Sequence, residues 1–217
     1  MPEIFNSPSL GISTIVYGRQ NLTGQRVEYL LDHTDPDSEH HIPEQIVLRR
    51  WKAKDGSERG LRFSGFRLSP KIWKTLNYVF EADVKAMCDF DEDHINDIFA
   101  IKSEAQEFRN QHFVTITGNK LKKLTSALGP ERLHKLLKRH NDPNFPERYG
   151  TPDLFLYAIK ERENKIDHFR FVEVKKPDEP LSSDQINELH FLNDELHVKA
   201  RVLFLDEREL YSVPISP

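Results

Sequence analysis

The sequence contains little cysteine and no long apolar run. Cys88 is the single cysteine, which excludes an internal disulfide and a zinc site built from several thiolates. Apolar runs extend over only a few residues, so a membrane-spanning helix is not expected. The first residues also lack the basic and then apolar pattern of a signal peptide. We therefore expect a cytoplasmic protein with no membrane partner.

Several catalytic signatures are missing as well. The sequence has no glycine-rich phosphate loop, no Gly-x-Ser-x-Gly elbow and no Cys–His pair. These absences argue against a P-loop nucleotide hydrolase and against a serine or cysteine nucleophile. The ten histidines do not follow a metal-binding spacing, so we expect them to be ordinary surface or core residues.

The composition is that of an ordinary soluble protein, with charge concentrated in local segments. The 217 residues are 37% hydrophobic and 30% charged, which suits one domain or one domain with a small appendage. The net charge is −4, yet residues 44–74 hold nine basic and three acidic residues, and residues 116–150 hold eight and three. Two basic segments favour a nucleic-acid-binding groove.

The N-terminal part has the pattern of a hairpin followed by a helix. Gln45–Ala53 and Leu61–Leu68 are predicted strands, joined by a turn at Asp55-Gly56. Ser69-Pro70 then begins a helix. Trp51 and Phe63 alternate with basic residues, a pattern typical of half-buried strands and also of base-stacking platforms. We assign residues 1–90 to an extension that positions a substrate or binds a partner.

The middle of the chain is predicted to be helical. Apolar residues recur on one stripe over residues 94–108, and again over 121–128 and 130–140. Gly129 separates the last two of these helices.

The last third alternates strands and a helix. Residues 154–159 and 169–175 form predicted strands with a hairpin loop between them. A helix capped by Ser182 or Ser183 runs to about residue 196, and a third strand covers 198–205. A helix that crosses over between strands implies a mixed sheet. The fold class is therefore α/β.

Three charged residues of these strands form the candidate site. Glu173 and Lys175 share one face of their strand, because side chains alternate. Asp153 begins the preceding strand after Pro152, which restricts the backbone. Antiparallel pairing of the two strands can place Asp153 beside Glu173. A buried Glu–Lys pair with a purely structural role would have the same local pattern.

Two convergent carboxylates call for a cation. They raise each other's pKa unless a positive charge neutralises them. Oxygen ligands without thiolates or paired histidines favour Mg²⁺ or Mn²⁺. Lys175 beside such a cation can orient water or stabilise charge on a phosphate. The expected reaction is hydrolysis of a phosphodiester bond.

Three linked motifs resemble the VRR-NUC branch of the PD-(D/E)xK nucleases, which includes the Fanconi-associated nuclease. They are Gly150-Thr-Pro-Asp-Leu, Glu173-Val-Lys-Lys-Pro and Leu181-Ser-Ser-Asp-Gln. The resemblance covers about residues 128–205. It implies a restriction-endonuclease-like αβββαβ core. It also implies Asp153 and Glu173 as metal ligands, to which we add Val174, Lys175 as the catalytic lysine, and Gln185 as a helix residue that faces the site.

The resemblance also implies a glutamate on a helix upstream of the Pro-Asp strand. Glu104 borders an apolar stripe and is the first choice for it. Glu131 and Glu107 are the alternatives, although Pro130-Glu131 is also simply a good helix start. The chain departs from the family pattern at Lys176, where glycine is usual, and at Asp178-Glu-Pro180, where small or basic residues are usual.

We therefore predict a Mg²⁺- or Mn²⁺-dependent deoxyribonuclease with its nuclease domain at residues 91–217. Its expected partner is double-stranded or branched DNA. The residues expected to contact DNA are Lys135, Lys138, Arg139, Arg148 and Lys176. An antibacterial DNA-cutting toxin held by an inhibitor protein uses the same site. A nuclease fold retained only for binding DNA or protein is a third alternative. The sequence leaves the oligomeric state open, including a dimer.

Overall fold

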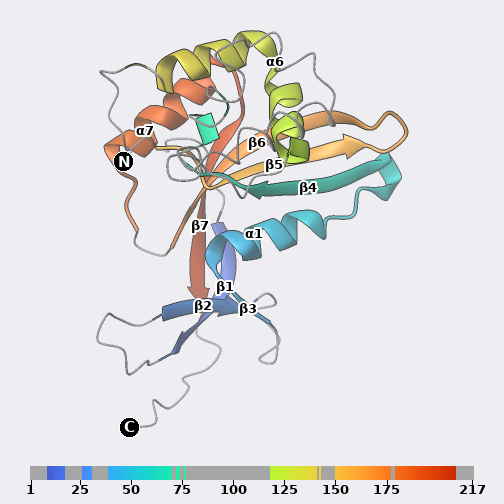
Figure 1. The fold of residues 1–217 in the computed structure, drawn as a ribbon. Helices are drawn as coiled ribbons and strands as arrows, with labels where there is room; N and C mark the ends of the chain where they lie inside the picture. The colour runs from blue at the N-terminus through green and yellow to red at the C-terminus, as the bar shows by residue number, and fades with distance from the viewer. Residues whose placement is uncertain are drawn as a thin grey trace, which may run out of the picture.

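A mixed sheet with helices on both faces makes up the fold (Figure 1). The computed structural model describes residues 9–17, 26–30, 39–69, 72, 73, 76, 118–140, 142, 150–176 and 179–208. Its strands are β1 (Ser9–Tyr17), β2 (Arg26–Leu30), β3 (His40–His41), β4 (Leu61–Arg67), β5 (Leu154–Lys160), β6 (Lys165–Lys175) and β7 (Ala200–Arg208). Its helices are α1 (Pro43–Lys52), α6 (Gly118–His140) and α7 (Ser183–His190), with a short 3₁₀ helix η1 (Ser57–Arg59) and a short π-helix η2 (Phe191–Glu195). No helix in these ranges is long and apolar enough to cross a membrane.

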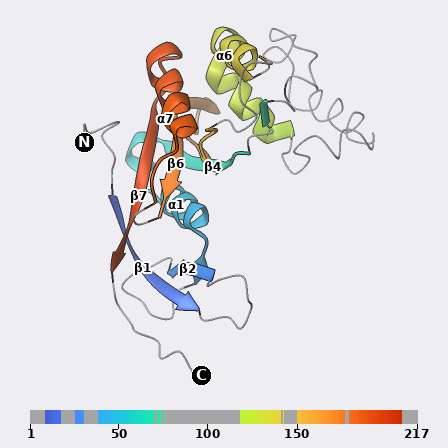
Figure 2. The ribbon, with the colours of Figure 1, turned by 90° about the vertical axis from the view of Figure 1, so that its left-hand side faces the viewer.

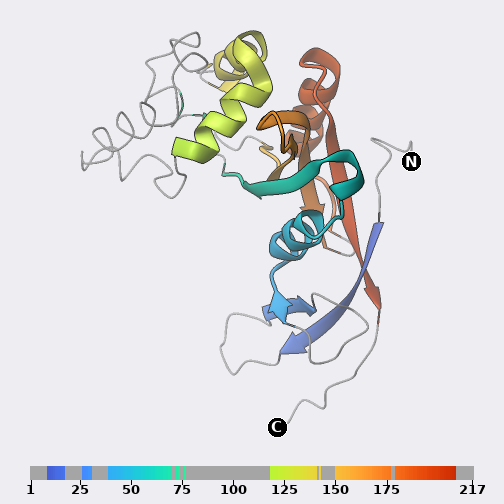
Figure 3. The same ribbon diagram turned by 90° about the vertical axis from the view of Figure 1, so that its right-hand side faces the viewer.

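The seven strands lie in the order β3-β2-β1-β7-β6-β5-β4. β7 is parallel to both of its neighbours, β6 and β1, and the other pairs are antiparallel. β1, β2 and β3 lie at the far end of β7, away from α6 and α7 (Figures 2 and 3). The elements α1, β4, β5, β6, α7 and β7 form an αβββαβ arrangement, which confirms the predicted fold class.

The predicted N-terminal hairpin is wrong in its first half. Residues 43–52 form helix α1, with Pro43 in its first turn. Ile46, Val47 and Trp51 share its buried side, a helical spacing that outweighs the loose alternation. The Asp55-Gly56 turn leads through η1 into β4. β4 then pairs with β5. Strand β4 therefore belongs to the same sheet as β5–β7, and helix α1 packs into the core of that sheet, although both precede the predicted boundary at residue 90.

Two hydrophobic cores hold the layers together. Between α1 and the sheet, α1 packs on Leu154, Leu156, Val172 and Val174. On the other face, Phe155, Tyr157 and Phe171 pack against leucines of α6 and α7. The odd-numbered residues of β5 and of the 169–175 part of β6 thus face α6 and α7, and the even-numbered residues of those parts face α1. A register shift beside Ala158 and Ile159 reverses this alternation at the start of β6, where Ile166 packs into the core under α6.

The other predicted elements have three outcomes. The predicted C-terminal strands correspond to β5, β6 and β7, and the predicted helix corresponds to α7 and η2. Gly129, with a φ of 72° and a ψ of 167°, is not helical and separates two helical parts of α6 at a kink, as predicted. In the helix predicted to begin at Ser69-Pro70, Ile72, Trp73 and Leu76 are buried in the larger core, and most of its other residues lie outside the described ranges. The helix predicted at 94–108 also lies outside them.

Candidate active site

Strand pairing brings Asp153 beside Glu173. In the antiparallel pair of β5 and β6, Leu154 lies opposite Val172, so the next positions outward are Asp153 and Glu173. The backbone N–H of Val174 donates to Asp153 Oδ2 at 2.8 Å. The Asp153 carboxylate is thereby fixed against the end of β6, as the sequence argument required.

Lys175 lies between two carboxylates. Its Nζ is 3.2 Å from Glu173 Oε1 and 3.3 Å from Glu179 Oε1. Lys175 and Glu173 are each only 3% exposed. The backbone N–H of Lys176 donates to Glu179 Oε2 at 3.2 Å, so Glu179 also fixes the turn after β6. The ammonium is held in place from both sides.

Gln185 reaches the site from the first turn of α7. Its backbone N–H donates to Ser182 Oγ at 3.2 Å, and its Oε1 accepts from the Ser182 N–H at 3.0 Å, which is a capping box. Because Oε1 is engaged there, the amide nitrogen points the other way and donates to Glu173 Oε1. The helix cap therefore sets the orientation of this amide.

Gly150 lets the start of β5 approach α7 closely. A Cβ at this position would collide with Gln185 Cα and with the Asp184 carbonyl oxygen. The glycine of the Gly-x-Pro-Asp motif is thus required by packing between two parts of the site. Thr151, the next residue, has a buried Oγ1 with no hydrogen-bond partner among the described residues.

Burial and mutual repulsion raise the pKa of both carboxyl groups. The pKa of Glu173 rises to about 8, first because of its burial and then because of the Asp153 charge, which Lys175 offsets in part. The pKa of Asp153 rises to about 6, again mainly through burial, against the hydrogen bond from Val174. Ionising both buried carboxyl groups is costly, and a bound cation would stabilise their ionised forms.

Glu44 is a neighbouring carboxylate that the sequence argument missed. It lies in the first turn of α1, and its negative charge also raises the pKa of Asp153. Its Oε1 is 3.6 Å from a terminal nitrogen of Arg67, on β4. Pro43-Glu44 is an ordinary helix start, and this local signal would have predicted a helix where a strand was predicted. Only the folded chain shows that this helix begins near Asp153.

The donor set fits a hard divalent cation. No group of three or more His, Cys, Asp or Glu residues suited to a metal occurs among the described residues. Mg²⁺ commonly uses only one or two protein carboxylates and completes its shell with water and substrate oxygens. Asp153 and Glu173 would supply the two carboxylates, and the main-chain carbonyl of Val174 would supply one further oxygen ligand.

The predicted upstream glutamates do not join this cluster in the described structure. Glu104 and Glu107 lie outside the described residues. Glu131 is exposed on α6 and accepts from Lys135 Nζ at 3.1 Å, one turn further on. This is a surface pair on α6.

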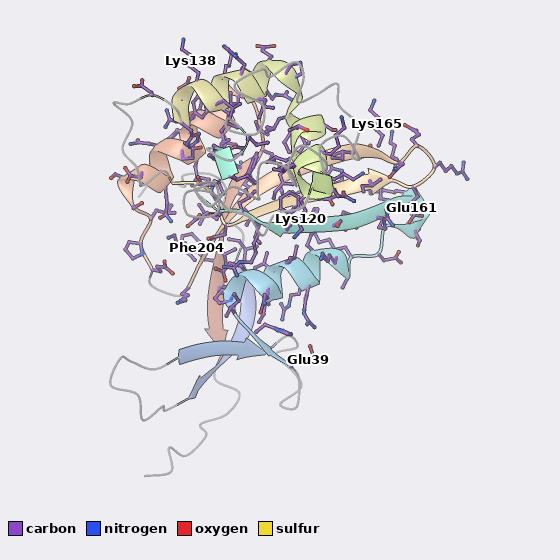
Figure 4. All side chains as sticks on the ribbon, viewed as in Figure 1. Glu39, Lys120, Lys138, Glu161, Lys165 and Phe204 are labelled. Carbon is purple, nitrogen blue, oxygen red and sulfur yellow. The ribbon has the colours of Figure 1, made fainter. Side chains whose placement is uncertain are left out.

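The residues predicted to contact DNA have different surroundings. Lys135, Lys138 and Lys176 are exposed, and Lys138 projects from the outer side of α6 (Figure 4). Arg139 is half-buried, with its Nε 3.1 Å from Glu188 Oε2 and its guanidinium 4.4 Å from the centre of the Phe191 ring. It links α6 to the helix after β6. Arg148 lies outside the described residues.

Comparison with known families gives a match over half of the chain. The model of the VRR-NUC domain matches residues 91–204. The chain belongs to the VRR-NUC domain family. This membership confirms the resemblance drawn from the three motifs and places Asp153, Glu173, Lys175 and Gln185 inside the matched region of a nuclease domain family.

Solved structures add a likeness of fold. One is paFAN1 bound to DNA with a 2-nucleotide 5′ flap and a gap; it is 14% identical, covers 95% of this chain and 38% of that chain, and has a TM-score of 0.53. A second, paFAN1 bound to DNA with a 1-nucleotide 5′ flap and a gap, has the same identity and coverage and a TM-score of 0.48. The VRR-NUC chain described here thus spans 38% of the length of paFAN1. No curated protein matches it.

Proposed function

We propose that this VRR-NUC protein is a metal-dependent nuclease that hydrolyses phosphodiester bonds of DNA. The observation that carries the proposal is the meeting of Asp153, Glu173 and Lys175 at the paired ends of β5 and β6. Family membership supports the same chemistry. The flap DNA bound in the paFAN1 structures supports branched DNA as the substrate class to test first.

The proposed metal ligands are the carboxylates of Asp153 and Glu173 and the main-chain carbonyl of Val174. Glu44 is the proposed third carboxylate, in place of Glu104, because its charge acts on Asp153. When bound there, Mg²⁺ or Mn²⁺ would supply Lewis-acid polarisation of the phosphate and lower the pKa of a water molecule. Arg67 would then balance the charge of Glu44 in the metal-free protein.

The chain's own residues would orient the reacting groups. Hydrolysis adds a water molecule to phosphorus while a P–O bond breaks. Lys175 would donate hydrogen bonds to a phosphate oxygen and stabilise the charge that develops there. Gln185 holds the Glu173 carboxylate through its amide nitrogen, and Glu179 holds Lys175 from the opposite side. These contacts fix the lysine before substrate binds, which lowers the cost of reorganisation.

Cleavage assays test the proposal. Purified protein is incubated with labelled linear, flapped and branched DNA and Mn²⁺, with and without chelator. We expect chelator-sensitive cleavage, a loss of at least 100-fold in Asp153→Asn and Lys175→Ala, and no loss in Lys165→Ala. Lys165 is a matched control because it is an exposed lysine at the opposite end of the same strand (Figure 4). Normal cleavage by Asp153→Asn or Lys175→Ala would reject the assignment.

One observation favours a second candidate, a nuclease fold that binds DNA without cutting it. Glu173 is almost fully enclosed, and its Oε1 already accepts from both Lys175 and Gln185. If this closure persists in solution, Mn²⁺ would give no heat of binding in calorimetry and no substrate would be cut, although DNA would still bind. Saturable Mn²⁺ binding that is lost in Asp153→Asn would exclude this candidate.

A further inference from the structure

A cavity of about 540 Å³ opens on the face of the sheet that carries α1. It lies between the C-terminal end of α1, the η1 turn and strands β4 and β6. Trp51, Phe63 and His168 form one aromatic wall, with the Trp51 and Phe63 ring centres 4.9 Å apart. Glu173 and Lys175 face the opposite side of the sheet, so this cavity is distinct from the candidate active site.

Two cations of the cavity lie against the Trp51 ring. Lys54 Nζ is 4.6 Å from the ring centre, and the Arg170 guanidinium carbon is 4.8 Å from it. The Trp51 N–H itself donates to the carbonyl oxygens of Ser64 and Tyr157, which anchors the ring between the strands. The two positive charges are therefore brought together by a fixed aromatic ring.

Further positive charge lies beside them, on Arg201 near the start of β7 and on Lys199 just before this strand. Arg201 and Lys199 share the face of Arg170, since Val172 pairs with Arg201 in the parallel ladder. Burial and then the charge of Arg201 lower the pKa of Arg170. Burial and then the charge of Arg170 lower the pKa of Lys54, and the charge of Arg170 is the main cause that lowers the pKa of Lys199. A concentration of like charge of this kind favours a bound anion.

Two acids, Asp55 and the exposed Glu58, also line the cavity. Asp55 Oδ1 accepts from the backbone N–H of Ser57 at 2.9 Å and from its hydroxyl at 2.7 Å, so its carboxylate closes the turn. Within the described ranges, Lys54 and Arg170 form no ion pair. The Nε of Arg170 is also buried with no hydrogen-bond partner among those residues, which leaves the guanidinium incompletely satisfied.

We propose that this cavity binds a phosphate-bearing nucleotide unit. Lys54 and Arg170 neutralise the phosphate, and the rings of Phe63 and His168 line the space that the sugar and base occupy. The volume is that of a small-molecule site, typically roughly 300–1,000 Å³, and exceeds what a phosphate alone requires. The nucleotide unit is either a free mononucleotide or part of a DNA strand. Binding here does not require the proposed nuclease function.

Calorimetry with the full chain in the presence of chelator tests the site without cleavage. The titrants are deoxyadenosine 5′-monophosphate, deoxyadenosine, inorganic phosphate and a 5′-phosphorylated single-stranded oligonucleotide. We expect the mononucleotide, the oligonucleotide or both to bind at least tenfold more tightly than deoxyadenosine and inorganic phosphate. Binding of the mononucleotide identifies a free nucleotide as a sufficient ligand, whereas binding of the oligonucleotide alone identifies a strand.

Two substitutions and one control assign the binding to this cavity. Arg170→Gln and Lys54→Gln should each weaken binding at least tenfold, because each removes a charge-assisted contact. Lys54 is exposed, so its replacement keeps the fold even if Arg170→Gln does not. Arg62→Gln, an exposed arginine on β4 outside the cavity, should bind as the wild type does. The proposal is overturned if neither nucleotide ligand binds, if deoxyadenosine or inorganic phosphate binds equally well, or if Lys54→Gln retains wild-type affinity.

Discussion

Individual side chains around Lys175 determine how the candidate site is charged. Lys175 shares its ammonium between Glu173 and Glu179. Glu179 belongs to the segment where this sequence departs from the usual small or basic residues of the family. Its negative charge raises the pKa of Glu173, and its second oxygen fixes the backbone of Lys176. The departure thus adds an acid that acts directly on the site.

The substitution Glu179→Gln should move the pH profile of Mn²⁺-dependent cleavage. Removing the charge lowers the pKa of Glu173, so the rise of activity with pH should shift to lower pH, and a less firmly held Lys175 should reduce kcat several-fold. A pH–rate profile measures both effects. Glu161→Gln, at the tip of the β5–β6 hairpin (Figure 4), serves as the control. An unchanged profile in Glu179→Gln would contradict this role.

The raised carboxyl pKa values also predict how stability depends on pH without metal. Glu173 goes from an ordinary 4.5 to about 8 on folding, and Asp153 from 3.8 to about 6. A raised acid pKa stabilises the folded protein while the group is protonated, and this contribution falls as pH rises from about 4.5 to about 8. The slope is at most about 1.4 kcal/mol per pH unit for one proton.

Urea unfolding in chelator at pH 5 and pH 8 measures this contribution. Glu173→Gln keeps the shape of the side chain and removes the titration, so its stability relative to the wild type should rise by a few kcal/mol from pH 5 to pH 8. A stability difference that stays constant over this range would show that Glu173 titrates near its ordinary pKa.

At the scale of single elements, the N-terminus of α7 connects helix formation to the site. Ser182→Ala should cost about 1 kcal/mol of stability through loss of the cap. It should also lower cleavage beyond what that loss explains, because the Gln185 amide loses its fixed orientation. Ser183→Ala, one residue further and without a capping bond, is the matched control. Thermal unfolding and kcat measured together separate the two effects, and equal kcat in both variants would refute the coupling.

The elements also differ in how far their sequence reveals them. β5, β6 and α7 were predictable because their patterns are local: short apolar runs in the two strands, a serine cap on the helix and three motifs in order. Helix α1 was mistaken for a strand because the loose alternation over Gln45–Ala53 was weighed above the helix-starting Pro43 and the helical spacing of Ile46, Val47 and Trp51. Glu44 was missed for a different reason, since its place near Asp153 depends on how α1 packs under the sheet.

At the scale of the whole molecule, the family match and the core do not begin at the same residue. The match starts at residue 91, whereas α1 and β4 cover one face and one edge of the sheet. We expect a fragment of residues 91–217 to remain unfolded, because it would expose the apolar residues that α1 buries and the edge of β5. Circular dichroism with a thermal scan checks this, and a cooperative transition in the fragment would contradict it.

The capping box at Gln185 has a consequence for substitutions at this position. Glutamate is as good as glutamine for closing such a cap, so a screen that selects only for folding would accept either residue. Glutamate, however, would turn an acceptor toward Glu173 in place of a donor and add a negative charge to those of Asp153, Glu173 and Glu179. An amide is therefore required at residue 185 because Glu173, on the neighbouring strand β6, needs a hydrogen-bond donor. A Gln185→Glu protein could fold well and would still lack that donor.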